Sequence, residues 1–141
     1  MGASMNRLEN WPERLAEFIC RTPHDFDWST CNCALFAADG VKSQTGVDFA
    51  APYRGPKTKR GMISRLRKVC GGGVEEAATR ELGEPLDNPK LAKRGDVVSA
   101  LVSDDDYPAL GICIGAKAVF VSEDDGLIYV PCELWRKAWS V

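Results

Sequence analysis

Cys33 is the residue whose type and position most directly suggest chemistry. It follows Asn32 and precedes the apolar segment "ALFAADGV" at 34–41. Asn32 is a good helix N-cap, so Cys33 is expected in the first turn of a helix. The partial positive charge at a helix N-terminus favours the thiolate, which is the reactive form of cysteine. This position is typical of a cysteine nucleophile.

A cysteine nucleophile also needs a base, normally a histidine, that moves its proton. The chain has one histidine, His24, in the turn-like segment "TPHD" at 22–25. A histidine in such a turn is more often solvated than catalytic. Two interpretations of Cys33 therefore remain. It is either a nucleophile or a cysteine of a buried helical stripe with Phe36, Ala37 and Val41. The residues alone favour the buried stripe.

The elements that must position Cys33 can be predicted from apolar periodicity. Four helices are expected, at Trp11–Cys20, Cys33–Gln44, Thr58–Cys70 and 74–83. Short β-type runs follow at 94–102, 108–115, 117–121 and 126–130. The pattern predicts a single α+β domain over residues 1–141, with N-terminal helices, including the Cys33 helix, packed on a C-terminal antiparallel sheet. Residues 1–5 are expected to be a cloning remnant or a disordered start.

Composition gives no global argument for a nucleic-acid or membrane partner. The 141 residues carry 18 Lys and Arg against 20 Asp and Glu, a formal net charge of -2,. The longest nearly apolar run, 108–121, is too short to span a bilayer, and the N-terminus lacks the pattern of a signal peptide,. We therefore expect neither nucleic-acid binding nor membrane insertion.

No cofactor or metal is expected. The six cysteines include no C-x-x-C pair, which argues against a structural zinc site,. Cys20, Cys70, Cys113 and Cys132 lie in apolar patterns and are expected to be reduced, buried thiols. The run Asp104–Asp106 lacks the spaced ligands of a calcium loop and is expected to be a solvated turn,.

Two surfaces are candidates for partner binding. The segment 57–68 has six Lys or Arg and no acid; it indicates either docking to an acidic partner or a solvated helix face. The C-terminal "LWRKAW" is either an interface anchor or an element that packs back on the sheet. The candidate contact residues are Arg60, Arg65, Arg67, Lys68, Trp135, Arg136 and Trp139.

Several segments together resemble a family of small proteins of tailed phages and prophages. They are "WSTCNCALFAADGV", "TGVDF", "YRG", "RGDVV", "ALGICIG", "EDDGLIYV" and "LWRKAWSV", which cover about 28–141. That family in turn resembles the NlpC-type, papain-like cell-wall peptidases. In those enzymes an Asp-Cys pair opens the nucleophile helix, and a later strand supplies the histidine.

Carried over to this chain, the resemblance places Cys33 at the nucleophile position and residues 95–98 at the first strand. Residues 109–115 take the place of the histidine strand, and Ala109 stands where the histidine is expected. The third member of the site would fall near 117–121, where no residue is a good match. The resemblance thus implies a papain-like fold that keeps the thiol and lacks the base.

The resemblance implies a structural or assembly protein of the phage tail tip or baseplate, without activity, that binds other tail proteins such as hub components. Its location would be the virion, or the host cytoplasm during assembly. The alternative is an active cysteine peptidase or amidase that degrades peptidoglycan during phage entry, with an unusual base such as His24. A nucleic-acid-binding factor that uses the basic helix is disfavoured by the net charge,. The missing histidine favours the inactive tail protein.

Overall fold

The computed structural model describes residues 6–21, 24–103 and 106–141. The expectations for residues 1–5, Asp104 and Asp105 lie outside these ranges. Within them the chain forms four α-helices and one five-stranded antiparallel sheet, which confirms the predicted α+β class.

The helices begin and end where local sequence signals predict. They are α1 (Trp11–Cys20), α2 (Cys33–Thr45), α3 (Lys59–Cys70) and α4 (Val74–Leu82). Asn32 caps α2 by accepting a hydrogen bond from Leu35 N at 2.9 Å,. Gly46 ends α2 with a left-handed φ of 79°, which glycine adopts at little steric cost,. Three short 3-10 helices lie in loops: η1 (Ala51–Tyr53), η2 (Pro89–Leu91) and η3 (Cys132–Leu134).

The sheet has the strand order β4-β3-β2-β1-β5, and all neighbours are antiparallel. Its strands are β1 (Val97–Ala100), β2 (Ala109–Cys113), β3 (Lys117–Ser122), β4 (Gly126–Pro131) and β5 (Lys137–Trp139). The register sets Val97 opposite Ile112 and Ile112 opposite Val119. The first four strands match the predicted runs, with β3 and β4 each extending one residue beyond them.

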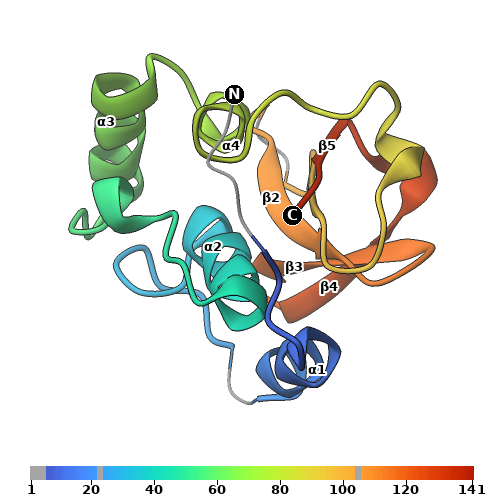
Figure 1. Ribbon diagram of the computed structural model, residues 1–141. Helices are drawn as coiled ribbons and strands as arrows, with labels where there is room; N and C mark the ends of the chain where they lie inside the picture. Colours follow the sequence, from blue (N-terminus) through green and yellow to red (C-terminus); the bar gives the residue numbers. More distant parts are fainter. Residues whose placement is uncertain (1–5, 22–23, 104–105) are drawn as a thin grey trace.

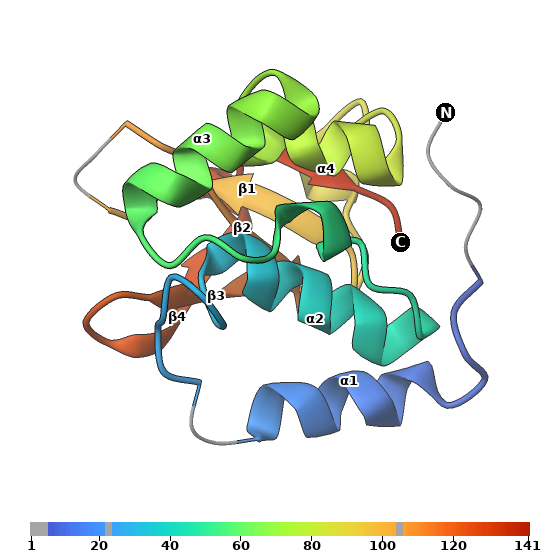
Figure 2. The ribbon, with the colours of Figure 1, turned by 90° about the vertical axis from the view of Figure 1, so that its left-hand side faces the viewer.

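α2 lies between α1 on one side and α3 and α4 on the other, against the sheet (Figures 1 and 2). Phe36, Ala37 and Val41 of α2 are almost completely buried, as the helical stripe predicts. They pack with Ile112 and Val119 of the sheet in the core on the helix side. Burial of this apolar face holds the Cys33 helix on the sheet.

The opposite face of the sheet has a second core, covered by loops instead of helices. Phe120, Val130 and Trp135 belong to it, and Leu86 and Ala92 from the loop around η2 pack against it. Cys33 is half-buried and packs against both cores. The thiol therefore lies at the junction of the two cores.

The C-terminal strand decides between the two interpretations of the tryptophans, because the segment packs back on the sheet. Trp139 in β5 is 0% exposed and donates from Nε1 to Thr79 Oγ1 at 3.1 Å. Trp135 is 6% exposed and donates from Nε1 to Val130 O. Both indoles are thus core residues, because pairing of β5 with β1 draws the segment back onto the sheet. The interpretation as exposed interface anchors is wrong for both.

All six cysteines are among the described residues, and none of them is in a disulfide. Cys113 is buried as expected, and Cys70 and Cys132 are half-buried. Cys20 is exposed, contrary to the prediction, because it ends α1 on the side away from the core.

Candidate functional site

Cys33 is the first residue of α2, as predicted. Its neighbour Asn32 is 1% exposed and does two things at once. Its side-chain oxygen caps the helix, and its Nδ2 donates to Trp28 O at 3.0 Å. Asn32 therefore fixes the helix N-terminus and also holds the backbone of Trp28 beside it.

Two cavities meet at Cys33. The first, of about 370 Å³, lies against α3 and is called here the α3 cavity. The second, of about 480 Å³, reaches the turn between β3 and β4 and is called the hairpin cavity. Their shared lining residues are Trp28, Cys33, Lys59, Tyr107 and Pro108. The two cavities together form one cleft across the Cys33 thiol.

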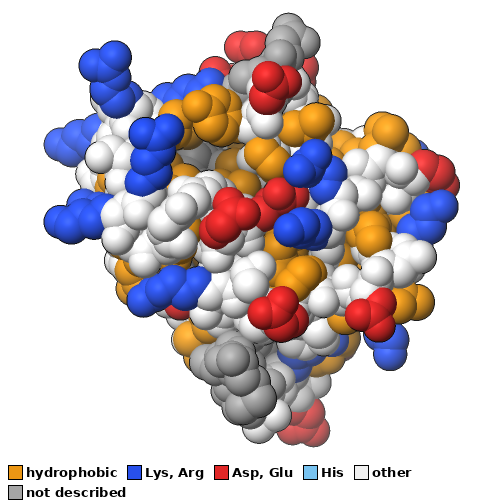
Figure 3. Space-filling view, turned by 90° about the horizontal axis from the view of Figure 1, so that it is seen from above, with side chains coloured by type: hydrophobic (Ala, Val, Ile, Leu, Met, Phe, Trp, Pro, Cys, Tyr) orange, Lys and Arg blue, Asp and Glu red, His pale blue; other side chains and the backbone are white. Residues whose placement is uncertain are grey.

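The α3 cavity is mainly apolar. Met62, Ile63 and Leu66 of α3 line it, together with Val74 of α4. Figure 3 shows the molecule from above, with Lys and Arg side chains gathered over α3 and hydrophobic side chains beside a hollow next to them. This part of the cleft favours apolar groups with a cationic rim.

The hairpin cavity contains Ala109, the position at which the family resemblance predicts that a histidine is missing. Ala109, the first residue of β2, lines it together with Cys33, as predicted. Ser122 at the end of β3 lines the same cavity. At the first position of β2 this cavity thus meets a methyl group, which cannot move a proton.

His24 lines neither of the two cavities at Cys33. It is 9% exposed, its Nε2 is 2.7 Å from Phe18 O, and its ring packs edge-on against Phe18 and Phe36. It lines a separate cavity of about 210 Å³ with Cys31, and neither of the cavities that Cys33 lines. The expectation of a solvated turn histidine is wrong, because the ring is part of the packing between α1 and α2.

Cys31 does not form a reactive pair with His24. Burial, and secondarily the charge of Asp39, raise the pKa of the Cys31 thiol. A raised pKa keeps the sulfur protonated near neutral pH, so it is a poor nucleophile.

The charges along the cleft are separated by sign. Lys59 lies with Nζ 5.5 Å from the centre of the Tyr107 ring,. Arg67 lines the α3 cavity, and Glu123, Asp124 and Asp125 line the far end of the hairpin cavity. The cleft is thus cationic at α3 and anionic at the β3–β4 turn.

The predicted basic face divides into two groups. Arg60, Arg67 and Lys68 are exposed and make no ion pair with a described residue. Arg65 differs, because its Nη1 donates to Arg54 O at 2.8 Å and Pro52 O at 3.3 Å. Arg65 therefore holds the η1 loop against α3, and its assignment as a contact residue stays a prediction.

Arg136 also forms an ion pair within the molecule, with Glu75. Its Nε donates to Glu75 Oε2 at 3.1 Å, and Ser99 Oγ donates to the same oxygen at 2.6 Å. Burial of Glu75 acts to raise its pKa, but the Arg136 guanidinium and the Ser99 hydroxyl outweigh it and hold the pKa below its ordinary value. Arg136 thus neutralises a buried carboxylate while its own side chain stays 46% exposed, and its assignment to partner binding stays a prediction.

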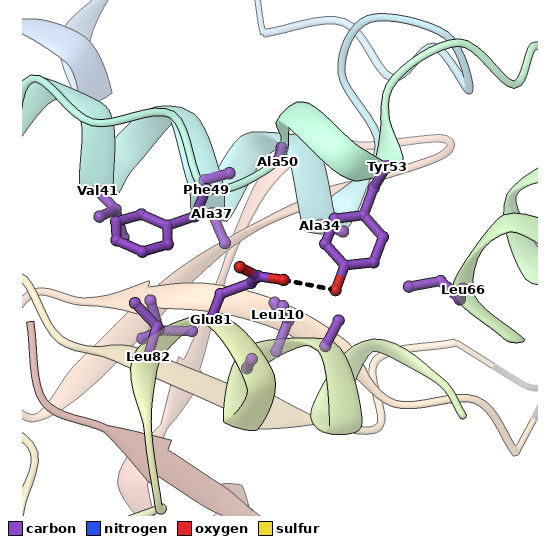
Figure 4. Close-up of a pocket in the computed structure, with 14 residues that line it drawn as sticks. Ala34, Ala37, Val41, Phe49, Ala50, Tyr53, Leu66, Glu81, Leu82 and Leu110 are labelled. Atoms are coloured by element: carbon purple, nitrogen blue, oxygen red, sulfur yellow. Dashed lines mark hydrogen bonds between the residues drawn. The ribbon is translucent and has the colours of Figure 1, made fainter. Parts of the chain in front are cut away.

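A smaller cavity of about 50 Å³ lies between α2, α4 and the η1 loop. Figure 4 shows Tyr53 and Glu81 pointing toward each other within it, and the phenol donates to the carboxylate at 2.9 Å. Burial, and then Glu81, raise the pKa of Tyr53 well above its ordinary value, so the phenol keeps its proton. This cavity is a packing feature, because its volume holds little more than one or two waters.

The described residues contain no group of three His, Cys, Asp or Glu placed to hold a metal ion. None of the described helices has the length and apolar content needed to cross a membrane.

Sequence reasoning missed the residues that wall the cleft beside Cys33. Trp28 and Tyr107 line both cavities, yet both come from loops without periodicity. One sequence feature could have placed Trp28 near Cys33: it lies four residues before Asn32, whose side chain caps the Cys33 helix. The acids Glu123, Asp124 and Asp125 lie in the turn between β3 and β4, where the sequence carries no signal of a binding role.

A comparison with protein families gives one result. The family model described as Domain of unknown function (DUF6950) matches residues 6–141. No curated protein matches the chain.

Proposed function

The chain belongs to the DUF6950 family, and on that premise we propose that it is a catalytically inactive binding protein with a papain-like, NlpC-type fold, which binds other proteins of a phage tail through the cleft at Cys33. The family description names no activity, so the proposal rests on the site and on the resemblance described for the sequence.

The order of elements supports the papain-like assignment. A cysteine opens a helix that packs on an antiparallel sheet, and Gly95 and Asp96 precede the first strand. Ala109 begins the next strand, where the peptidase pattern has its histidine. Fold does not determine activity, so the site must be judged on its own residues.

One observation carries the inactivity. Ala109 and Cys33 line the same cavity, while the single histidine of the chain lines a different one and contacts Phe18 O. Nucleophile and base act as a unit, so loss of the base removes most of the rate that the pair provides. What the chain retains is an aromatic-lined cleft, which is suited to binding.

The assignment to a phage tail rests on the resemblance of the segments quoted above to small proteins of tailed phages and prophages. The site is compatible with a structural role there, because a cleft without a base can still hold a segment of a neighbouring protein. The tail tip or baseplate is the proposed location.

An active peptidase or amidase is the second candidate. The position of Cys33 at the N-terminus of α2, inside a cleft, favours it, since the helix dipole favours a thiolate there,. Peptidoglycan would then be the substrate.

Hydrolysis separates the two candidates. Wild type and Cys33→Ala are incubated with purified muropeptides, and products are followed by mass spectrometry. We expect no cleavage by either protein. Cleavage by wild type that disappears in Cys33→Ala would establish the peptidase instead.

Tail incorporation tests the binding role. Tagged wild type, Tyr107→Ala and Tyr129→Ala are supplied to the encoding phage or prophage, and purified particles are analysed for the chain. Both tyrosines are 52% exposed, but only Tyr107 lines the cleft. We expect incorporation of wild type and Tyr129→Ala and reduced incorporation of Tyr107→Ala. Particles that never contain the wild-type chain would refute the tail assignment.

A further inference from the structure

The α3 end of the cleft is positively charged. Arg67 lines this end, and Arg60 and Lys68 are exposed on the same helix. Glu76 is the one acidic residue among the described lining of the α3 cavity. Its carboxylate accepts from Gly73 N at 2.8 Å and is used in capping α4. A ligand at this end therefore meets an apolar wall with a mainly cationic rim.

The middle of the cleft is aromatic and apolar apart from Lys59, which lines both cavities beside Tyr107. Trp28, Tyr107 and Pro108 line both cavities, and Met62 and Ile63 extend the apolar wall toward α3. Side chains of this kind bind apolar groups of a ligand by removing their surface from water. A free inorganic ion gains nothing from such a wall.

The hairpin end is negatively charged. Glu123, Asp124 and Asp125 are exposed in the β3–β4 turn and line the hairpin cavity. None of these three makes an ion pair with a described residue. Their charges are therefore available to a ligand that enters the cavity.

We propose that the cleft binds an extended peptide segment with charges of opposite sign on the two sides of an apolar centre: an acidic side chain at the α3 end and a basic side chain at the hairpin end. This inference rests on the proposed binding function and adds the chemistry of the partner. An extended chain fits the need, because it advances about 3.3 Å per residue and places separate side chains along a groove.

Charge complementarity also argues against a polyanion. A single-stranded nucleic acid would gain from Arg67, Arg60 and Lys68, but its phosphates would be repelled by the acids of the hairpin end. A bipolar peptide is attracted at both ends.

Three labelled synthetic peptides with the same Leu-Phe-Leu centre and blocked termini test the proposal by fluorescence anisotropy. One has aspartates on one side and lysines on the other, one has aspartates on both sides, and one has lysines on both sides. We expect wild type to bind the bipolar peptide roughly 3- to 10-fold more tightly than either of the others in about 50 mM salt. The preference should shrink in about 300 mM salt, since salt screens exposed charges.

Variants at each end should change the preferred peptide in opposite directions. Arg67→Glu makes both ends acidic and should shift the preference to the doubly basic peptide. Glu123→Lys with Asp124→Lys makes the hairpin end basic and should shift it to the doubly acidic peptide. Lys90→Glu and Asp87→Lys are matched controls, because both residues are exposed and neither lines the cleft; they should keep the wild-type order.

Equal binding of the three peptides, or preferences unchanged by the cleft variants, would overturn the inference. It would also be overturned if a single-stranded oligonucleotide bound more tightly than the bipolar peptide and depended equally on Arg60 and Arg67. These binding results overturn only the peptide inference. The proposed function still stands if the protein enters phage tails and does not cleave muropeptides. Conversely, if the protein cleaves muropeptides and still prefers the bipolar peptide, the proposed function is rejected and the peptide inference is kept.

Discussion

Single residues with their partners decide both the stability and the chemistry of this protein. Glu75 is 7% exposed and survives as an anion because Arg136 and Ser99 surround it. Ala109 contributes only a methyl group to the cavity that Cys33 lines. Each of these positions leads to a prediction.

The pairing of Glu75 should make stability depend on pH. Its pKa is lowered in the folded protein, so the pairing stabilises above the unfolded value and this contribution is lost as pH falls through the folded pKa,. We expect the unfolding free energy of wild type to fall more steeply than that of Glu75→Gln between about pH 5 and pH 3. Urea unfolding at each pH measures this. Glu84→Gln, at an exposed residue, should follow wild type, and parallel curves for wild type and Glu75→Gln would contradict the prediction.

A histidine at position 109 should change the reactivity of Cys33. A neighbouring imidazolium favours the thiolate, so Ala109→His should raise the alkylation rate of Cys33 by iodoacetamide roughly tenfold or more near neutral pH. Mass spectrometry of the peptide that contains Cys33 follows the rate. Ala116→His, at an exposed position outside the cleft, serves as the control and should leave the rate unchanged. An unchanged rate in folded Ala109→His would show that residue 109 does not face the thiol.

At the scale of elements, the junction between α2 and β1 depends on Gly95. Its φ of 93° suits glycine, and a Cβ there would overlap Gln44 Oε1,. Gln44 is 0% exposed; its Nε2 donates to Gly95 O at 2.9 Å and its Oε1 accepts from Arg7 Nε at 2.9 Å. The chain thus enters the sheet through a contact that tolerates no side chain.

Gly95→Ala should be much more damaging than Gly115→Ala. Gly115 also has a positive φ, of 127°, but nothing lies within 4 Å of a Cβ built there. Both substitutions carry the backbone cost of about 1 kcal/mol, and Gly95→Ala adds the overlap with Gln44, which we expect to cost about 2 kcal/mol more. Urea unfolding of the two variants gives the difference directly. Equal destabilisation would mean that Gln44 moves aside without loss.

The helices and most strands could be predicted because their signals are local. Asn32, Gly46 and the stripe with Phe36 fix α2 within the sequence itself, and the bounds differ from the prediction by one residue,. β5 has only three residues and exists because β1 offers an edge, so no local pattern predicts it,.

The site was predictable in part for the same reason. Cys33 and Ala109 lie in regular elements, whereas Trp28 and Tyr107 come from loops whose places depend on the whole fold. The burial of His24 follows from tertiary packing on Phe18 and Phe36, which a turn-like sequence does not reveal.

At the scale of the whole molecule, β5 joins the helical half to the sheet. Trp139 lies opposite Val97 in the register, packs in the core on the helix side and bonds to Thr79 of α4. Leu86 N also donates to Ala138 O at 2.8 Å. The last strand therefore contacts both halves.

Removal of the Trp139 side chain should weaken the whole fold. We expect Trp139→Ala to lower the unfolding free energy by about 3–5 kcal/mol, since a fully buried indole leaves a large cavity,. Leu134→Ala, at a residue that is 62% exposed, should change it by about 0.5 kcal/mol or less,. Circular dichroism and tryptophan fluorescence should give coincident urea transitions for Leu134→Ala. A Trp139→Ala variant as stable as wild type would show that β5 does not link the two halves.

The position of β5 beside β1 also has a consequence during translation. β1 leaves the ribosome about forty residues before β5,. In that interval β2 can pair with one edge of β1. The backbone of Val97–Ser99 on the other edge stays unpaired until Lys137–Trp139 has been synthesised. An unpaired edge is a template for other nascent chains. A chaperone that covers this edge would therefore protect the growing polypeptide at a place that the finished molecule no longer exposes.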